Sequence, residues 1–276
     1  MTYEEILYDV ADGIATVTLN RPEKLNAWTM RMGAEVRHAL CAADKDPEVR
    51  VMIVTGAGKG YCAGADMEML QAAQGSGDAS ALSVNDPHLA VKTDTSLPAA
   101  FRGDYSYPLG LQKPVIAAVN GVAAGLGLSY MLYYDMRIAS DRARMGTIFS
   151  RRGLVAEHGS AYLLPRLVGM ANACDILFSG RLVNAEEALQ MRLVNRVVPH
   201  DSLMPIVREI ATEMATLCSP RSIRLMKQQL YSDLFNDLQT SMEIADREMV
   251  ASFTTEDFRE GVASFLQRRK PRFSGR

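Results

Sequence analysis

Two runs of small residues in this sequence each stand between an apolar segment and a helical segment, where they could stabilise negative charge. The first run, Ala63-Gly64-Ala65, follows the apolar segment 51–54 and precedes a helical pattern that begins at Met67. The first N–H groups of a helix lack internal acceptors and lie at the positive end of its dipole. Small side chains let a ligand approach these groups closely. The run can therefore present N–H donors to an oxygen that becomes negative during a reaction.

The second run, 120–127, repeats this arrangement between the apolar segments 114–119 and 128–134. Two facing turns of this kind would hold a developing anion, which is useful only if another group moves a proton. Glu157 is the candidate for that group, because it lies in an apolar stretch bounded by Gly153 and Gly159. A carboxylate here could equally well cap the helix that follows. Both interpretations of Glu157 remain open from the residues alone.

Other motifs are less informative. The segment 56–60 (Gly-Ala-Gly-Lys-Gly) lacks the spacing of a phosphate-binding loop and is interpreted as a tight turn. The segment 125–127 lacks the third glycine of a dinucleotide fingerprint. A hydrolase built on His158 and Ser160 requires the two side chains to meet, and their nearness in sequence does not establish this.

An α/β body followed by helices must position these groups. Hydrophobic patterns predict strands at 13–19, 51–54, 114–119, 135–140 and 193–198, and helices at 28–43, 67–71, 128–134 and 171–178. Beyond residue 205 only helices are predicted, over 206–214, 222–231, 234–251 and 256–268. The segment 72–111 shows no clear pattern, and so long a connection is usually a functional lid or a mobile segment. Near its end, Tyr105 and Tyr107 either fold over a pocket or plug the loop against the body.

Composition and charge favour a cytoplasmic enzyme or binding protein. The 276 residues carry a formal net charge of −2, which argues against nucleic acid or an anionic membrane as the main partner. The four cysteines are scattered and show no metal-binding spacing. The N-terminus lacks a signal-peptide pattern, and no apolar run is long enough to span a bilayer.

Four blocks of the sequence resemble the crotonase, or enoyl-CoA hydratase/isomerase, family; they are 19–27, 61–66, 114–121 with Asp135, and 256–271. The resemblance extends over nearly the whole chain. It implies an α/β fold, with a crotonase-like spiral of ββα units over 1–200 that holds an acyl-CoA site. It implies a helical region over 201–276 for oligomerisation into a homotrimer or a dimer of trimers. The implied substrate is a coenzyme A thioester, which is not a separate cofactor, and neither a metal nor a redox cofactor is expected.

The resemblance also assigns site residues. It places the family's oxyanion hole at the backbone N–H groups of Ala65 and Leu126, in the two turns described above. Arg268 matches a position that can approach the nucleotide phosphates, and a solvated basic tail explains it equally well. The other positions that match contacts to coenzyme A or the substrate are Lys24, Leu25, Ala27, Ala63, Gly64, Asp66, Met67, Gly125 and Phe149.

The sequence departs from the hydratases of the family at both of their catalytic glutamates. Ser129 and Phe149 stand at those positions, and neither can replace a carboxylate as a base. Glu157 falls where some enoyl-CoA isomerases of the family carry their single acidic base. We therefore expect Glu157 to move a proton between the α- and γ-carbons of a 3-enoyl-CoA. Phe149, Leu154 and Val155 are expected to keep the site dry and so to raise the pKa of Glu157.

Three alternatives remain. The first is a hydratase in which Glu157 and a water held by Ser129 suffice. The second is a hydrolase or aryl dehalogenase, which needs a nucleophile aimed at the carbonyl or ring. The third is a non-catalytic acyl-CoA-binding protein that has lost the hydratase glutamates, because fold alone does not fix function.

Overall fold

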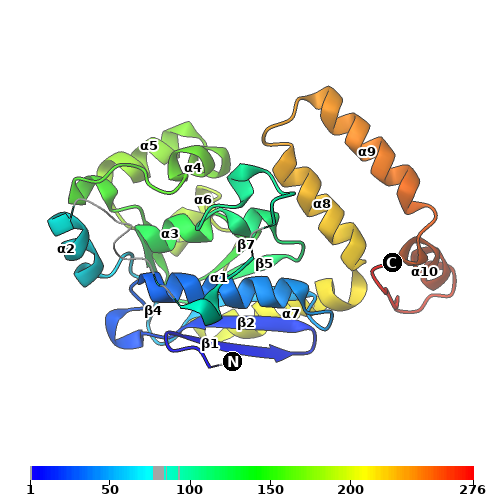
Figure 1. Ribbon diagram of the computed structural model, residues 1–276, viewed down its shortest axis with the longest axis horizontal. Coiled ribbons are helices and arrows are strands. Elements are labelled where there is room, and N and C mark those ends of the chain that lie inside the picture. The colour runs from blue at the N-terminus through cyan, green and yellow to red at the C-terminus, as the bar shows by residue number, and fades with distance from the viewer. Residues whose placement is uncertain (1, 77–83, 85, 93) are drawn as a thin grey trace.

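The computed structural model describes residues 2–76, 84, 86–92 and 94–276 (Figure 1). The larger of its two sheets has six strands in the order β1 (Ile6–Ala11), β2 (Ile14–Leu19), β3 (Val51–Gly56), β5 (Val115–Val119), β7 (Met136–Ser140) and β10 (Arg196–Val198). The pair β1–β2 is antiparallel, and every other neighbouring pair is parallel. The predicted α/β class is confirmed.

A smaller sheet joins four short strands in the order β4 (Gly60–Cys62), β6 (Val122–Ala124), β8 (Arg144–Gly146) and β9 (Val183–Asn184). Strands β3, β5 and β7 each lead directly into a strand of this second sheet. The first two of these strand pairs then enter helices α2 (Met67–Ser76) and α3 (Leu126–Met131). The repeating ββα unit therefore brings the two small-residue turns to the same side of the smaller sheet.

Helices cover both faces of the larger sheet. Met32, Val36 and Leu40 of helix α1 (Met30–Lys45) pack in one apolar cluster with Met52 and Val54. Helix α7 (Leu203–Leu217) packs in a second cluster, with Ile14, Ile53 and Ile116. Because neighbouring residues of a strand point to opposite faces, the apolar run 51–54 serves both clusters. Its prediction as a strand buried on two sides is confirmed.

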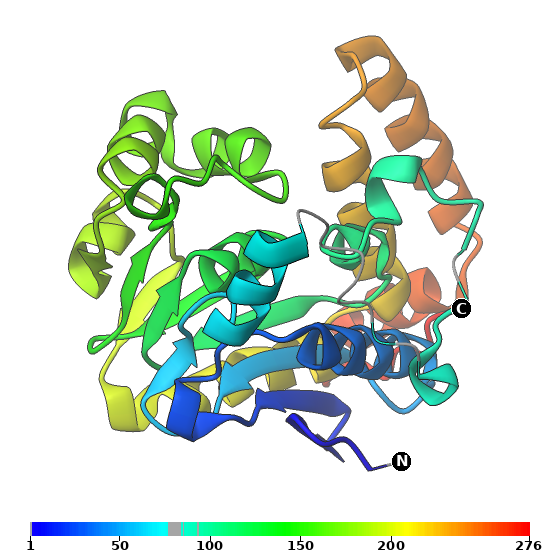
Figure 2. The same ribbon diagram turned by 60° about the vertical axis from the view of Figure 1, so that its left-hand side comes forward.

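The remaining helices form two groups (Figure 2). One group comprises α4 (Ser160–Val168), α5 (Met170–Ser179) and α6 (Ala185–Gln190). The other comprises α8 (Pro220–Ser232), α9 (Leu238–Ser252) and α10 (Glu256–Leu266) and extends to one side of the body. Lys227 and Tyr231 attach α8 to the body, each with a 2.8 Å contact to the carboxylate of Asp135.

Several elements differ from the sequence predictions. Strands β1, β4, β6, β8 and β9 and helix α6 were not predicted, because all but β1 are too short to show a period. Helix α3 begins at Leu126 rather than 128, and α9 begins at Leu238 rather than 234. Part of the segment 72–111 folds into the 3₁₀ turns η3 (Pro87–Leu89), η4 (Ala99–Phe101) and η5 (Tyr107–Gly110), whereas residues 77–83, 85 and 93 lie outside the described residues. No helix in the described part of the chain is both long and apolar enough to cross a membrane.

Candidate active site

The two small-residue turns lie against each other through their backbones. A Cβ atom at Gly64 would lie 3.0 Å from the carbonyl oxygen of Ala124, and Gly64 has a φ of +107°. A Cβ at Gly127 would lie 2.7 Å from the Cβ of Cys62. Glycine is therefore required at these positions for steric reasons, because any side chain would force the turns apart. The two turns belong to one site.

Each turn contains at least one backbone N–H group for which the described residues offer no acceptor. On either side of Ala65, the carbonyl of Gly64 accepts from Trp28 N–H (2.7 Å) and the N–H of Asp66 donates to the carbonyl of Trp28 (2.9 Å). In the second turn, Gly125 N–H donates to the carbonyl of Gly146 at 2.9 Å. The N–H groups of Ala65 and Leu126 have no hydrogen-bond acceptor within the described residues. Both groups are thus available to the oxygen of a ligand.

The polar residues beside the first turn are engaged with one another. The buried carboxylate of Asp66 accepts from the N–H of Glu68 at 2.9 Å, at the start of α2, and pairs with Arg21 at 2.9 Å. Burial favours the neutral acid, but these hydrogen bonds and the charges of Arg21 and Lys24 outweigh it, so the pKa of Asp66 is lowered. Lys24 contacts Glu68 at 2.8 Å. Asp66 therefore holds the turn in place with both carboxylate oxygens.

The other predicted contact positions of this region surround that turn. The side chains of Leu25 and Met67 are 40% and 60% exposed, so both can contact a ligand lying over the turn. The carbonyl of Leu25 accepts from Ala63 N–H at 3.0 Å, and that of Ala27 accepts from Arg21 at 2.6 Å. The segment 24–27 is thereby attached directly to the turn 63–66.

A chain of hydrogen bonds connects the second turn to Glu157. Ser129, in the first turn of α3, is buried, and its Oγ lies 2.7 Å from the Oγ of Ser160. Ser160 in turn donates to the carbonyl of Glu157 from its backbone N–H (2.9 Å) and from its Oγ (2.6 Å). Both hydroxyls have protein partners, so Ser129 is a structural link between α3 and the loop that carries Glu157.

The capping interpretation of Glu157 is wrong. The N-cap residue of α4 is Gly159, and no side chain caps this helix. Instead, the Glu157 side chain is 28% exposed, and its Oε2 lies 3.5 Å from Nε2 of His158. Desolvation raises the pKa of Glu157 above its ordinary value of 4.5. The result is a partly buried, partly accessible carboxylate with a raised pKa, a combination that suits a catalytic base.

The apolar surroundings of Glu157 differ from the prediction. Leu154 and Val155 are 39% and 77% exposed in this chain, so they do not shield Glu157 as expected. Phe149 is buried, and its ring lies 3.9 Å from where a Cβ of Gly125 would be. The position of a hydratase glutamate is therefore filled by an aromatic ring packed against the second turn.

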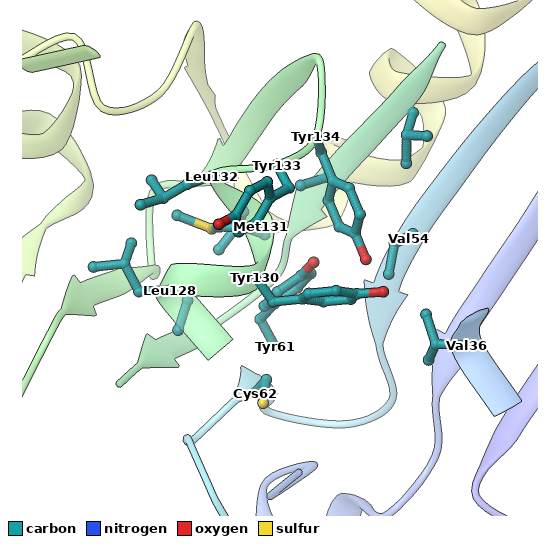
Figure 3. Close-up of a cluster of buried hydrophobic side chains, with 14 of the residues drawn as sticks. Val36, Val54, Tyr61, Cys62, Leu128, Tyr130, Met131, Leu132, Tyr133 and Tyr134 are labelled. Atoms are coloured by element: carbon teal, nitrogen blue, oxygen red, sulfur yellow. The ribbon is translucent and has the colours of Figure 1, made fainter. Parts of the chain in front are cut away.

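Several tyrosine side chains lie close to His158 and helix α3. Tyr107 is buried, and its hydroxyl bonds that of Tyr130, so it plugs the 72–111 segment against the body. Tyr105 is only half-buried, and its ring lies 4.0 Å from the imidazole of His158. In Figure 3, Tyr133 points away from the Tyr130–Tyr134 pair, and its hydroxyl donates to the carbonyl of His158 at 2.6 Å. Sequence reasoning missed Tyr133 and the contact of Ser160 with Ser129, because contacts across 25–31 residues leave no periodic signal.

Two other predicted possibilities are not supported by the geometry. Ser160 bonds Ser129 and Glu157, whereas the His158 ring contacts Tyr105 and Glu157, so Ser160 and His158 do not pair with each other. Arg268 follows α10, which lies at the opposite end of the molecule from α2 (Figure 1). Within one chain, Arg268 is not brought to the two turns.

Comparison with known proteins agrees with the fold described above. The family model described as enoyl-CoA hydratase/isomerase matches residues 9–276. The chain is 34% identical to 1,2-epoxyphenylacetyl-CoA isomerase of Escherichia coli strain K12, over 99% of each chain. It is 32% identical to crotonyl-CoA hydratase of Syntrophomonas wolfei, also over 99% of each. The crystal structure of an enoyl-CoA hydratase from Bacillus anthracis superposes with a TM-score of 0.86 at 29% identity, covering 99% of this chain and 100% of that one. The chain therefore belongs to the enoyl-CoA hydratase/isomerase family, whose members act on acyl-CoA thioesters.

Proposed function

We propose that this protein is an enoyl-CoA isomerase in which Glu157 is the only proton-transfer base. The proposal rests on the difference among the side chains at three positions. Ser129 is buried and bonded to Ser160, Phe149 is an apolar ring, and Glu157 is an accessible carboxylate with a raised pKa. Isomerisation needs one base that takes a proton and returns it, whereas the family's hydration mechanism uses two carboxylates.

In this mechanism the N–H groups of Ala65 and Leu126 form the oxyanion hole. The thioester oxygen of a 3-enoyl-CoA accepts from both groups, which lowers the energy of the enolate more than that of the ground state. The geometry supports this role, because both N–H groups lack protein acceptors and lie in turns that touch. A single donor of this kind contributes about 3–4 kcal/mol of transition-state stabilisation.

Glu157 then carries the proton. Its carboxylate removes a proton from the α-carbon, and the electrons move onto the thioester oxygen to give a dienolate. These electrons return as the γ-carbon takes up a proton, and the double bond then lies in conjugation with the thioester carbonyl. The carboxylic acid delivers the proton to the γ-carbon, which restores the carboxylate. The raised pKa of Glu157 strengthens it as a base.

Coenzyme A is proposed to lie along the segment 24–27 and the first turn. Lys24 is 42% exposed beside that turn, and Leu25 and Met67 offer apolar surface to the nucleotide base. Arg268 can contact the same ligand only from a second chain, since α10 lies far from α2 (Figure 1).

We also propose that the chain forms a homotrimer or a dimer of trimers through α8–α10. These helices expose many large apolar side chains, as assembly surfaces do. They line an apolar hollow of about 670 Å³ and include Leu230, Leu238, Phe265 and Leu266, which are 72–83% exposed. The cytoplasm is the proposed location, because all four cysteines are free thiols.

Separate incubations with a 3-enoyl-CoA and with crotonyl-CoA test the reaction. Isomerisation makes the conjugated enoyl thioester absorbance appear from the first substrate, whereas hydration makes it disappear from the second. The proposal is supported if the absorbance appears from the 3-enoyl-CoA and does not disappear from crotonyl-CoA. If the absorbance only disappears from crotonyl-CoA, the result would establish the hydratase alternative, in which Glu157 activates a water. Coenzyme A binding without either change would favour a non-catalytic acyl-CoA-binding protein.

A further inference from the structure

We propose that His158 exchanges the catalytic proton of Glu157 with solvent, so that the proton returned to the γ-carbon comes largely from water. This inference rests on the proposed isomerase function. It follows from the way in which the fold holds the imidazole of His158 beside the Glu157 carboxylate.

Two side chains contact the imidazole, and a third holds the backbone of His158. Its Nε2 lies 3.5 Å from Oε2 of Glu157, and its ring lies 4.0 Å from the ring of Tyr105 at an interplanar angle of 40°. The carbonyl of His158 accepts from the hydroxyl of Tyr133 at 2.6 Å. A Cβ at Gly159 would collide with that hydroxyl, so the glycine is needed for this arrangement. The separation of 3.5 Å is longer than a hydrogen bond, and catalytic contacts often shorten when the substrate binds.

The backbone of His158 adopts a positive φ, which is uncommon for residues other than glycine. Its φ is +49°, in the left-handed region, which residues with a Cβ rarely enter. Strained conformations of this kind persist where the surrounding structure imposes them, and they cluster at functional sites.

The pKa values of Glu157 and His158 favour proton exchange between the two side chains. Burial raises the pKa of Glu157 from its ordinary value of 4.5 and lowers the pKa of His158 from its ordinary value of 6.5, so the two pKa values approach each other. A smaller difference between the two pKa values lowers the free-energy cost of moving a proton from one side chain to the other. Tyr105 also faces the pair, against the imidazole of His158. Burial, Asp104 and Glu157 all raise its pKa, so it stays neutral.

The steps balance without any redox change. Glu157 takes the α-proton and becomes a carboxylic acid. Nε2 of His158 accepts this proton, and its Nδ1–H then passes to water. The side chain of His158 is 29% exposed, which provides that solvent contact. The reverse sequence brings a solvent proton to Glu157 and then to the γ-carbon.

Isomerisation in D₂O, stopped at low conversion, tests the exchange. Mass spectrometry or NMR measures the deuterium at the γ-carbon per turnover. We expect deuterium in most wild-type product and a fall of about threefold or more in His158→Phe, which keeps a ring for Tyr105 but cannot carry a proton. His158→Asn is a second variant, because asparagine tolerates a positive φ and folds where phenylalanine does not. His88→Asn, at an exposed histidine outside the site, is the matched control.

The deuterium content separates this role from a structural one, because slower turnover by itself does not change the source of the proton. Unchanged deuterium content in both His158 variants would overturn the inference. If Glu157→Gln still isomerised the substrate, the proposed function itself would fail, and the two failures are therefore distinguishable.

Discussion

The Oγ atoms of Ser129 and Ser160 lie 2.7 Å apart in the protein interior, and this contact joins the helix that begins at Leu126 to the loop that carries Glu157. Hydrogen bonds therefore connect the second small-residue turn to the candidate base. A hydratase of this family would place a glutamate at residue 129. In this chain the position is used to align two parts of the site.

The Ser129–Ser160 contact gives the first prediction. Ser160→Ala removes the hydroxyl that bonds both Ser129 and the carbonyl of Glu157. We expect the free energy of unfolding to fall by about 1–3 kcal/mol, because Ser129 loses a partner in the interior. We also expect kcat to fall more than KM rises. Thr216→Ala, which removes an exposed helix hydroxyl, is the control for denaturant melts and kinetics. Unchanged kinetics in Ser160→Ala would show that the link does not align the base.

The second prediction concerns the base itself. Glu157→Gln should lower kcat by about 10²–10⁴-fold, because an amide cannot accept the α-proton. Acyl-CoA binding, measured by calorimetry, should be nearly unchanged, since the oxyanion donors belong to the backbone. Glu186→Gln, at an exposed carboxylate of α6, should leave turnover as it is. Retained activity in Glu157→Gln would refute the assignment.

The pKa shift of Glu157 predicts a pH dependence of activity. Only the carboxylate acts as a base, so kcat/KM should fall about tenfold per pH unit below the raised pKa of Glu157. That fall should begin above pH 4.5, the ordinary value. A profile that stays flat down to pH 4.5 would contradict the assignment.

The same shift predicts how pH changes stability. A raised carboxyl pKa means that the folded state binds more protons than the unfolded state between pH 4.5 and the folded pKa. The contribution of Glu157 to the free energy of unfolding therefore declines as pH rises through that window. Above it, Glu157→Gln should be at least as stable as wild type, and chemical denaturation at two pH values measures the difference.

Steric exclusion at the two turns predicts the effect of a methyl group. Gly127→Ala would place a Cβ 2.7 Å from the Cβ of Cys62, so we expect about 1–3 kcal/mol of destabilisation from overpacking, together with loss of activity. Gly261→Ala in α10 is the matched substitution, because the nearest contact of its Cβ is at 3.8 Å. This variant should gain about 0.5–1 kcal/mol from helix propensity. Equal effects of the two changes would show that the turns are not in close contact.

The apolar surface of α8–α10 predicts the assembly behaviour. Phe265→Glu introduces a charge at a side chain that is 83% exposed in the single chain, and we expect it to shift trimers toward monomers in sedimentation analysis. Leu189→Glu in α6 also adds a charge at an exposed apolar position and should leave the assembly intact. A monomeric wild-type protein would exclude this proposal.

Local sequence determined the main strands, the two small-residue turns and the candidate base. Long apolar runs such as 51–54 and 114–119 indicate strands buried on both faces, and small residues before a helix indicate accessible N–H groups. Glu157 was identified because a carboxylate in an apolar stretch needs an explanation, and resemblance to the family supplied one. These features depend on neighbouring residues or on recognisable blocks.

Tertiary structure alone decided how these parts meet. Pairing across the smaller sheet, whose strands are only two or three residues long, is what places Gly64 beside Ala124. Such strands have no measurable period, and their pairing depends on the fold as a whole. The contacts of His158 with Tyr105 and Tyr133 join residues 25 or more positions apart. The sequence therefore indicated Glu157 as the candidate base, whereas the packing of distant segments decided which groups surround it.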